Sequence, residues 1–162
     1  MSKQIFPFWD LLQSQSVLTI ATADASGCWS APVLYAADLV DERPVLYFLS
    51  APASRHINHS PQSGVAASIY TSYDGDWQAI KGLQMQGAIA EISKNHRQQF
   101  ATIYFARFPE IAKIIHSPTS EQQQKIAAAF EKSGYYSFTP TYIRATDNAD
   151  QFANRREWNL LS

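Results

Sequence analysis

The first 92 residues are dominated by short stretches of β-forming apolar residues that alternate with turn-forming clusters. SVLTIATAD at 16–24 runs into the turn residues 24–27, and CWSAPVLYAAD follows at 28–38. A second turn at 41–44 leads into PVLYFLS at 44–50. This pattern predicts three strands joined by two hairpins.

Two further strands are predicted beyond a short polar segment. GVAASIYTSY at 64–73 and WQAIKGLQMQGAIAEI at 77–92 flank Asp74 and Gly75. This dipeptide is typical of tight hairpins, because glycine accepts a positive φ. We therefore expect a hairpin at Asp74 and Gly75 and an antiparallel meander up to residue 92.

The period of the apolar residues becomes helical between about 94 and 134. One helix is predicted up to Pro109 and a second, shorter one directly after it. A third is predicted to begin at Thr119 or Ser120, where a glutamine three residues on completes a capping box, and to end at Gly134. Four aromatic residues of the first helix form a stripe that we assign to packing: Phe100, Tyr104, Phe105 and Phe108.

Both ends of the chain carry further elements. IFPFWDLLQSQ at 5–15 has the apolar spacing of a short amphipathic helix, which we expect to act as a lid over another part of the protein. YYSFTPTYIRATDN at 135–148 predicts the last strand, with Pro140 marking an edge or a bulge. The tail NADQFANRREWNLL at 148–161 has no clear period.

These elements predict one mainly β domain over residues 1–162, with a helical insertion at about 94–134 before the last strand. The chain has no internal repeat and no linker-like tract. Six short antiparallel strands with tight turns favour a barrel over an open sheet, because closure removes exposed strand edges.

Composition narrows the classes of partner. Thirteen basic and fourteen acidic residues give a net charge of −1, so we expect neither nucleic acid nor a membrane as partner. The single cysteine, Cys28, cannot form an internal disulfide. The first 20 residues lack a continuous apolar run, so we expect a cytoplasmic protein.

The segment SAPASRHINHSP at 50–61 places a cation at an unusual position. Ser50 and Ser54 favour the start of a short helix over about 53–60, which Pro61 ends. Arg55 then lies in the first turn, where the helix dipole disfavours a cation by ~0.3–1 kcal/mol. A phosphate held by the guanidinium, the hydroxyls and free amides would compensate. An exposed arginine in an ordinary capped turn is the alternative.

Motifs for other chemistries are absent from the sequence. There is no GxSxG, no P-loop, and no partner that would activate Cys28. His56 and His59 are three residues apart, but a zinc site needs two more ligands. We therefore expect no metal site, and His59 is expected to pack or cap the end of the short helix. Catalytic side chains remain unknown at this point.

Several of these stretches carry a resemblance to a known family. WSAPVLY, VLYFLS, SRHINHSPQSGVAASI and IKGLQMQGAIAEI resemble the FMN-binding split barrels related to pyridoxamine 5′-phosphate oxidase, over residues 16–92. The remainder is similar to a small bacterial branch of that superfamily.

The resemblance implies a homodimer with FMN at the interface. The phosphate would lie just after the third strand, near Leu49, Ser50, Ser54 and Arg55. His56 stands where relatives often have lysine.

The resemblance also implies that the flavin ring lies along the backbone of the second strand. Pro32 has no amide, so the amide of residue 31 or 33 would have to reach the flavin. Lys81 and Gly82 would lie near the ring edge. The strand residues implied are Ser30, Ala31, Pro32 and Val33.

The activity that the resemblance implies is flavin-dependent oxidation or reduction of a small molecule. Pyridoxamine 5′-phosphate oxidation itself is not expected, because the tail lacks the histidine of the true oxidases. A protein that binds haem or flavin without catalysis stays open, with His56 or His116 as axial ligand. A barrel that has lost its cofactor also stays open, because of His56 and Pro32.

The tail adds a last candidate contact. Arg155, Arg156 and Trp158 could cover the flavin of a partner subunit or bind an anionic substrate. We favour docking of the tail on its own barrel.

Overall fold

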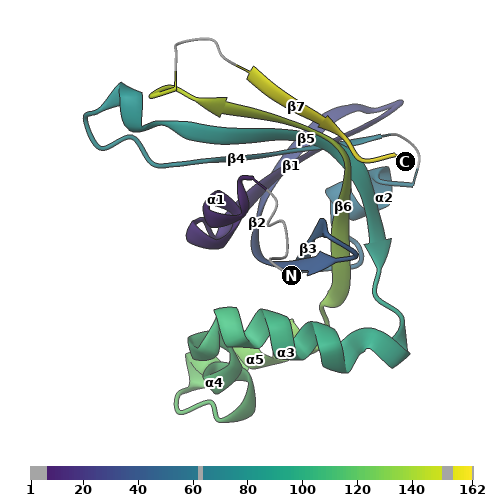
Figure 1. Ribbon diagram of the computed structural model, residues 1–162. Helices are drawn as coiled ribbons and strands as arrows, with labels where there is room; N and C mark the ends of the chain where they lie inside the picture. Colours follow the sequence, from purple (N-terminus) through teal and green to yellow (C-terminus); the bar gives the residue numbers. More distant parts are fainter. Residues whose placement is uncertain (1–6, 62–63, 151–154, 162) are drawn as a thin grey trace.

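Seven antiparallel strands form the body of the protein, and three helices form a separate layer beside it (Figure 1). The computed structural model describes residues 7–61, 64–150 and 155–161. The strands are β1 Val17–Asp24, β2 Gly27–Val40, β3 Arg43–Ser50, β4 Val65–Tyr70, β5 Lys81–Glu91, β6 Gly134–Asp147 and β7 Arg155–Asn159. The helices are α1 Trp9–Ser14, α2 Arg55–His59, α3 Arg97–Arg107, α4 Pro109–His116 and α5 Glu121–Glu131, with 3₁₀ turns at Trp77–Ala79 and Lys94–His96.

The sheet curls until its two ends meet. The strand order is β3-β2-β1-β4-β5-β6-β7, and β3 also pairs with β6 along Leu46–Ser50. Six strands thereby form a barrel-like ring, and β7 extends β6 on the outside. The predicted mainly β, antiparallel architecture is confirmed, but the count of six strands is wrong.

The ring has a split between β2 and β3. These strands pair only from Tyr35↔Phe48 to Val40↔Arg43, so residues 27–34 of β2 pair with β1 alone. Helix α2 packs against β1 and β2. The split therefore leaves one edge of β2 without a strand partner and places α2 beside it.

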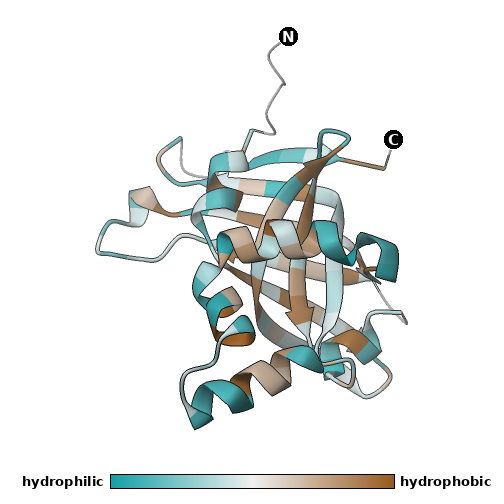
Figure 2. Ribbon diagram, turned by 90° about the horizontal axis from the view of Figure 1, so that it is seen from below, coloured by the Kyte–Doolittle hydropathy of each residue, from teal (hydrophilic) through white to brown (hydrophobic). Residues whose placement is uncertain are grey.

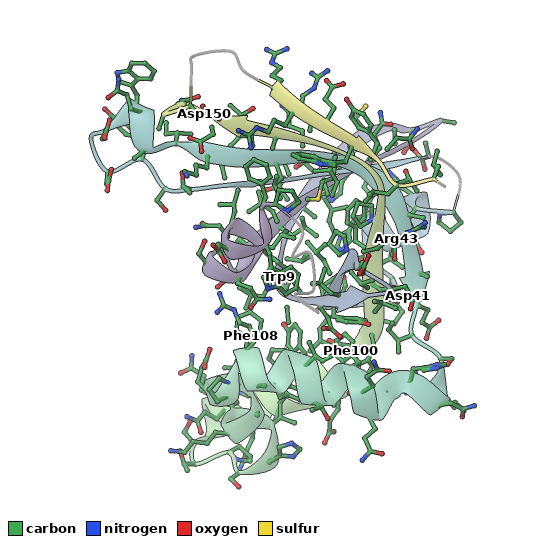
Figure 3. All side chains as sticks on the ribbon, in the orientation of Figure 1. Trp9, Asp41, Arg43, Phe100, Phe108 and Asp150 are labelled. Atoms are coloured by element: carbon green, nitrogen blue, oxygen red, sulfur yellow. The ribbon has the colours of Figure 1, made fainter. Side chains whose placement is uncertain are left out.

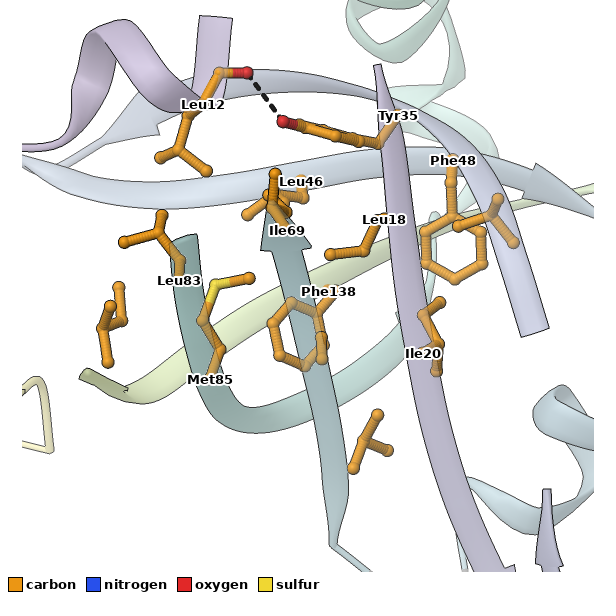
Figure 4. Packing of buried hydrophobic residues seen from close by; sticks show 14 of the residues in the cluster. Leu12, Leu18, Ile20, Tyr35, Leu46, Phe48, Ile69, Leu83, Met85 and Phe138 are labelled. Carbon is orange, nitrogen blue, oxygen red and sulfur yellow. Dashed lines mark hydrogen bonds between the residues drawn. The ribbon is translucent and has the colours of Figure 1, made fainter. Parts of the chain in front are cut away.

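The main core fills the ring with side chains from alternate strand positions (Figure 4). The predicted helix is confirmed over residues 9–14 as α1, and it lies over the core through buried Leu11 and Leu12; Ile5 lies outside the described residues. The Tyr35 hydroxyl donates to the Leu12 carbonyl at 2.8 Å, which ties α1 to β2. Burial raises the pKa of Tyr35, so this donor keeps its proton.

A second core joins the helical layer to the outer face of β2 and β3. Phe100 stacks on Tyr104 and meets Tyr47 edge-on, with centroids 5.3 and 5.7 Å apart. Figure 3 shows Phe100 and Phe108 on the side of α3 that faces the sheet. Phe105 is half-buried and packs against this cluster. The assignment of the aromatic stripe to packing is confirmed.

The helices follow their predicted signals. Figure 2, seen from the helical side, shows hydrophobic and hydrophilic residues interleaved along them. The Ser120 hydroxyl accepts from the Gln123 amide at 3.2 Å, while Gln123 Oε1 accepts from the Thr119 amide at 2.7 Å. The predicted cap at Ser120 is thus confirmed, but Gln123 reaches back to the amide of Thr119, one residue before the N-cap, so the capping box is formed only in part. None of the described helices is long and apolar enough to cross a membrane.

Two local predictions were wrong. The expected tight hairpin at Asp74 and Gly75 is instead a ten-residue connection, 71–80, because Asp76 accepts from the Gln78 amide at 2.9 Å and starts a 3₁₀ turn. The tail contains a strand, β7, although its residues show no alternation of apolar and polar types. It forms because the outer edge of β6 is free to pair along Tyr142–Thr146.

Pro140 lies at a bulge, one of its two predicted settings. The β5–β6 register shifts between Gln86 and Gly87, where Gly87 faces Pro140 and Gln86 faces Tyr142. Gly87 permits the close approach, because a Cβ there would lie 2.3 Å from the Thr139 carbonyl oxygen. The proline therefore sits where the ladder is already interrupted.

Replacing Gly87 by alanine should lower the free energy of unfolding by about 1–3 kcal/mol, since the new methyl group must displace backbone. Gly64→Ala is the matched control, because a Cβ at Gly64 meets nothing within 4 Å. Urea unfolding of both variants measures the difference. Equal stability of the two variants would show that the bulge tolerates a side chain.

Candidate functional site

The guanidinium of Arg55 is held on the outside of the split, at the far end of the β1–β2 hairpin. Its Nε donates to His59 Nε2 and its Nη2 to Ser26 Oγ, each at 3.2 Å. The group also lies 4.9 Å from the centroid of the Trp29 ring. Two of the five N–H donors of a guanidinium are thereby engaged, and the other three make no hydrogen bond to the residues that the structure describes.

His59 links this arginine to a carboxylate. Its Nε2 lies 3.2 Å from Asp24 Oδ2, and its Nδ1 lies 3.4 Å from Thr22 Oγ1. One ring nitrogen cannot accept from Arg55 and donate to Asp24 at once, so only one of these two contacts is a hydrogen bond at a time. Hydrogen bonds from Ser26 lower the pKa of Asp24, and the charges of His59 and Arg55 lower it further. His59 itself is buried, as expected for a packing residue.

The two serines of the predicted phosphate site form a second cluster with His56. Ser50 Oγ lies 2.8 Å from His56 Nε2 and 3.0 Å from Ser54 Oγ. Ser54 is the N-cap of α2, but its side chain makes no capping hydrogen bond. Burial lowers the pKa of His56, which favours the neutral ring. A neutral ring would offer a phosphate a hydrogen bond but no charge.

The backbone of β2 offers donors at different positions from those expected. Ser30 and Pro32 face outward, whereas Ala31 and Val33 are buried. The Tyr35 amide donates to the Ser16 carbonyl at 3.0 Å, so antiparallel alternation also directs the amides of residues 33 and 31 toward β1. The amides of Ser30 and Leu34 point to the free edge instead. The expectation of a donor at 31 or 33 was wrong for this reason.

Lys81 and Gly82 lie at the opposite end of the sheet from Arg55. Lys81 Nζ pairs with Asp147 Oδ2 at 3.0 Å, and the Lys81 carbonyl accepts from the Thr71 amide. Arg55 and Lys81 are separated by the length of β1. This strand has eight residues and spans about 26 Å at ~3.3 Å per residue. One flavin cannot touch both groups within a single subunit. Leu49 is half-buried at the end of β3, beside Ser50.

Between these two ends lies an outward face without any charge. It crosses β2, β1, β4 and β5 in rows such as Pro32–Thr19–Ser68–Gln84 and Ser30–Ala21–Ala66–Gln86. A shallow hollow of about 290 Å³ lies at its centre, between Ala21 and Ala66. We call this the uncharged face: Val17, Thr19, Ala21, Ser30, Pro32, Leu34, Ala66, Ser68, Tyr70, Gln84 and Gln86.

The tail packs on its own subunit. Trp158 meets Phe8 edge-on with centroids 5.4 Å apart and joins the main core. Arg156 pairs with Asp150 at 2.6 Å, and Arg155 is exposed. The preferred prediction of docking is confirmed for Trp158. Within residues 7–61, 64–150 and 155–161, no three His, Cys, Asp or Glu side chains gather as metal ligands.

Sequence reasoning missed the groups that hold Arg55. Trp29 and Ser26 belong to the hairpin and lie far from Arg55 along the chain. Their signal was weak, because Ser26 reads as a turn residue and Trp29 as one strand position among several. The partnership depends on the packing of α2 beside β1, which no local pattern encodes.

No protein-family model and no curated protein matches the sequence. Solved structures do match. A haem-binding protein from Mycobacterium smegmatis has a TM-score of 0.63 at 14% identity, covering 92% of this chain and 55% of that one. An FAD-binding protein from Mesorhizobium loti has a TM-score of 0.61 at 14% identity, covering 85% and 89%. HutZ, the haem storage protein from Vibrio cholerae, has a TM-score of 0.53 at 14% identity, covering 85% and 91%.

The fold is shared. The chain spans just over half the length of the mycobacterial haem-binding protein. At these identities the likeness is one of fold, and the ligands named are those of the other proteins.

The buried His56 should make stability depend on pH. The unfolded chain, with an ordinary pKa near 6.5, binds the proton before the folded one, whose pKa is lower. The free energy of unfolding should therefore fall as the pH drops below about 6.5. His56→Gln should flatten this dependence between about pH 7 and 5, whereas His116→Gln, at an exposed position, should not. Denaturant unfolding across this range checks it, and parallel curves for all three proteins would contradict it.

Proposed function

We propose that the protein is a member of the FMN-binding split-barrel superfamily that binds FMN as a homodimer and acts as a flavin-dependent oxidoreductase on a small molecule. The observation that carries this is Arg55. Its guanidinium is fixed by His59, Ser26 and Trp29 while three N–H donors stay unused. A phosphate is a suitable partner for such a fork, because it accepts several charge-assisted hydrogen bonds.

The surroundings of Arg55 suit the rest of a flavin. The free edge of β2 presents the amide of Ser30, and the exposed Trp29 ring offers a flat apolar surface next to the cation. The fit is partial within one subunit, because Lys81 lies too far away. Residues that would hold the cofactor on one chain are thus Arg55, Trp29 and Ser30.

A homodimer would complete the site. The uncharged face is a contiguous outward patch in a chain that is 17% charged. Charged residues are also depleted at the centre of protein–protein interfaces, so this face suits an interface. If a twofold axis runs across the strands, Lys81 of the partner subunit comes to the Arg55 end. We propose this arrangement, with cofactor sites at the subunit interface.

Bound flavin would supply the two-electron redox chemistry. The chain's own residues would bind the phosphate, orient the ring and keep charge away from it. The true pyridoxamine 5′-phosphate oxidases have a histidine in the last strand, and β7, RREWN, has none. We therefore propose another small-molecule substrate. An exposed free cysteine, Cys28, suits the reducing cytoplasm.

Haem is a second candidate, favoured by the shared fold with two haem proteins. Arg55 could pair with a haem propionate as it would with a phosphate. However, none of the four histidines lies on the uncharged face: His56 faces Ser50, His59 faces Asp24, and His96 and His116 lie in the helical insertion. An axial ligand from these residues is therefore not in place, which ranks flavin first.

An absorption spectrum of the purified protein with and without added FMN tests the class of ligand. Arg55→Ala should weaken FMN binding about 10- to 100-fold, as expected for loss of a charge-assisted contact, with the fold intact. Arg107→Ala is the control, because this arginine also makes two hydrogen bonds but lies on α3. Flavin fluorescence titration measures both. Unchanged affinity in Arg55→Ala would remove the assignment, and a Soret band would favour haem.

Ala66→Glu should convert the dimer to a monomer, because it buries a carboxylate in the centre of the uncharged face. Ala128→Glu, at an exposed position on α5, should leave the dimer unchanged. Light scattering after gel filtration gives the masses. A monomeric wild-type protein, or a dimeric Ala66→Glu variant, would count against this interface while leaving the flavin test untouched.

A further inference from the structure

A separate pocket lies between the helical insertion and the ring, away from Arg55. It has a volume of about 430 Å³ and opens between α3, the β2–β3 hairpin and the outer side of β6. This size is in the range of sites for small organic molecules. Figure 1 shows α3 running beneath β3 and β6, so two layers supply its walls.

The floor carries two hydroxyls without partners. Tyr47 and Ser137 face each other across the β3–β6 ladder, and each residue is only 8% exposed. Neither side chain makes a hydrogen bond to any other described residue, yet neither hydroxyl is fully sealed. Because both residues line the pocket and neither hydroxyl is sealed, a polar ligand in the pocket would replace the water that these hydroxyls otherwise bond.

The rest of the lining separates an apolar interior from a polar rim. The edge of the Tyr47 ring meets Phe100, with centroids 5.7 Å apart. Aliphatic walls from three elements enclose these rings. The apolar wall residues are Val40, Val45 and Ile92, and the polar rim residues are Glu91, Ser93, His96 and Gln99.

The charged groups at the pocket have both signs, since Glu91 in its lining pairs with Arg97. Glu91 is the one charged residue in the lining, and Arg97 approaches it only to 3.8 Å. Burial raises the pKa of Tyr47, and the charge of Asp38 raises it further. Ser93 and His96 bond each other at 2.8 Å, which leaves the Glu91 carboxylate as the strongest rim group.

We propose that this pocket binds a small planar aromatic molecule that carries hydrogen-bonding groups and an amine or no charge. The rings of Tyr47 and Phe100 contact its faces and edges, and the two floor hydroxyls bond its polar group. Glu91 favours an amine at the rim and disfavours a carboxylate. The site does not depend on flavin binding at Arg55.

Tryptamine, indole and indole-3-acetate are suitable probes, because they share one ring system and differ in charge. Titration of the ¹⁵N-labelled protein with each should shift the amide signals of Tyr47, Ser137 and residues 92–100. Tryptamine should bind at least about fivefold more tightly than indole-3-acetate, as expected for one nearby carboxylate. Ser137→Val should weaken tryptamine binding about tenfold, since it replaces the hydroxyl by a methyl group and adds a second methyl group. Thr139→Val is the matched control, on the same face of β6 but outside the lining.

Glu91→Gln keeps the test decisive if Ser137→Val does not fold. It should reduce the preference for tryptamine over indole-3-acetate to about one, and Glu131→Gln, on α5, should not. The proposal is overturned if no probe binds at millimolar concentration, if the shifted signals lie elsewhere, or if Glu91→Gln retains the preference.

Discussion

The pairing of β3 with β6 is the constraint on which the rest of the structure depends. These strands are distant in sequence, and their ladder along Leu46–Ser50 turns a curved sheet into a ring. Closure gives the inward side chains one shared interior, where Phe48 stacks on Tyr136 with centroids 5.7 Å apart. It also makes β3 leave β2 after Tyr35↔Phe48, which creates the split. The helical insertion connects β5 to β6, so closure fixes where α3 must lie as well.

Two surfaces with different chemistry follow from this geometry. At the split, α2 brings Arg55 to the tip of the β1–β2 hairpin, where a turn serine and a strand tryptophan receive it. On the closed side, α3 covers β3 and β6 incompletely and leaves the Tyr47–Ser137 pair accessible. The strands between them carry the uncharged face. A ring of six strands thus lies between the Arg55 guanidinium and the pocket beside α3.

Much of this could be predicted from the sequence because the signals are local. The alternation in 16–50, the capping residues at Ser120 and the proline at the bulge each act over a few residues. The strand β7 could not be predicted, because RREWN has no strand-like pattern of its own. It forms a strand because the outer edge of β6 has no other strand beside it. Arg55 was found through its position in a helix turn, but its partners were not, because they meet only after α2 docks. The large distance between Lys81 and Arg55 likewise depends on strand register, which is a property of the whole sheet.

The free edge of β2 has a consequence for behaviour at high concentration. An unpaired strand edge invites pairing with a strand of another molecule, which leads to aggregation. Here the backbone nitrogens of residues 30, 32 and 34 face the open side, and Pro32 has no N–H to donate. A strand from another molecule that paired here would find N–H donors at Ser30 and Leu34. It would find none at Pro32 between them, so the hydrogen bond in the middle of the ladder would be missing. The proline thus makes this edge a poor template for amyloid-like growth.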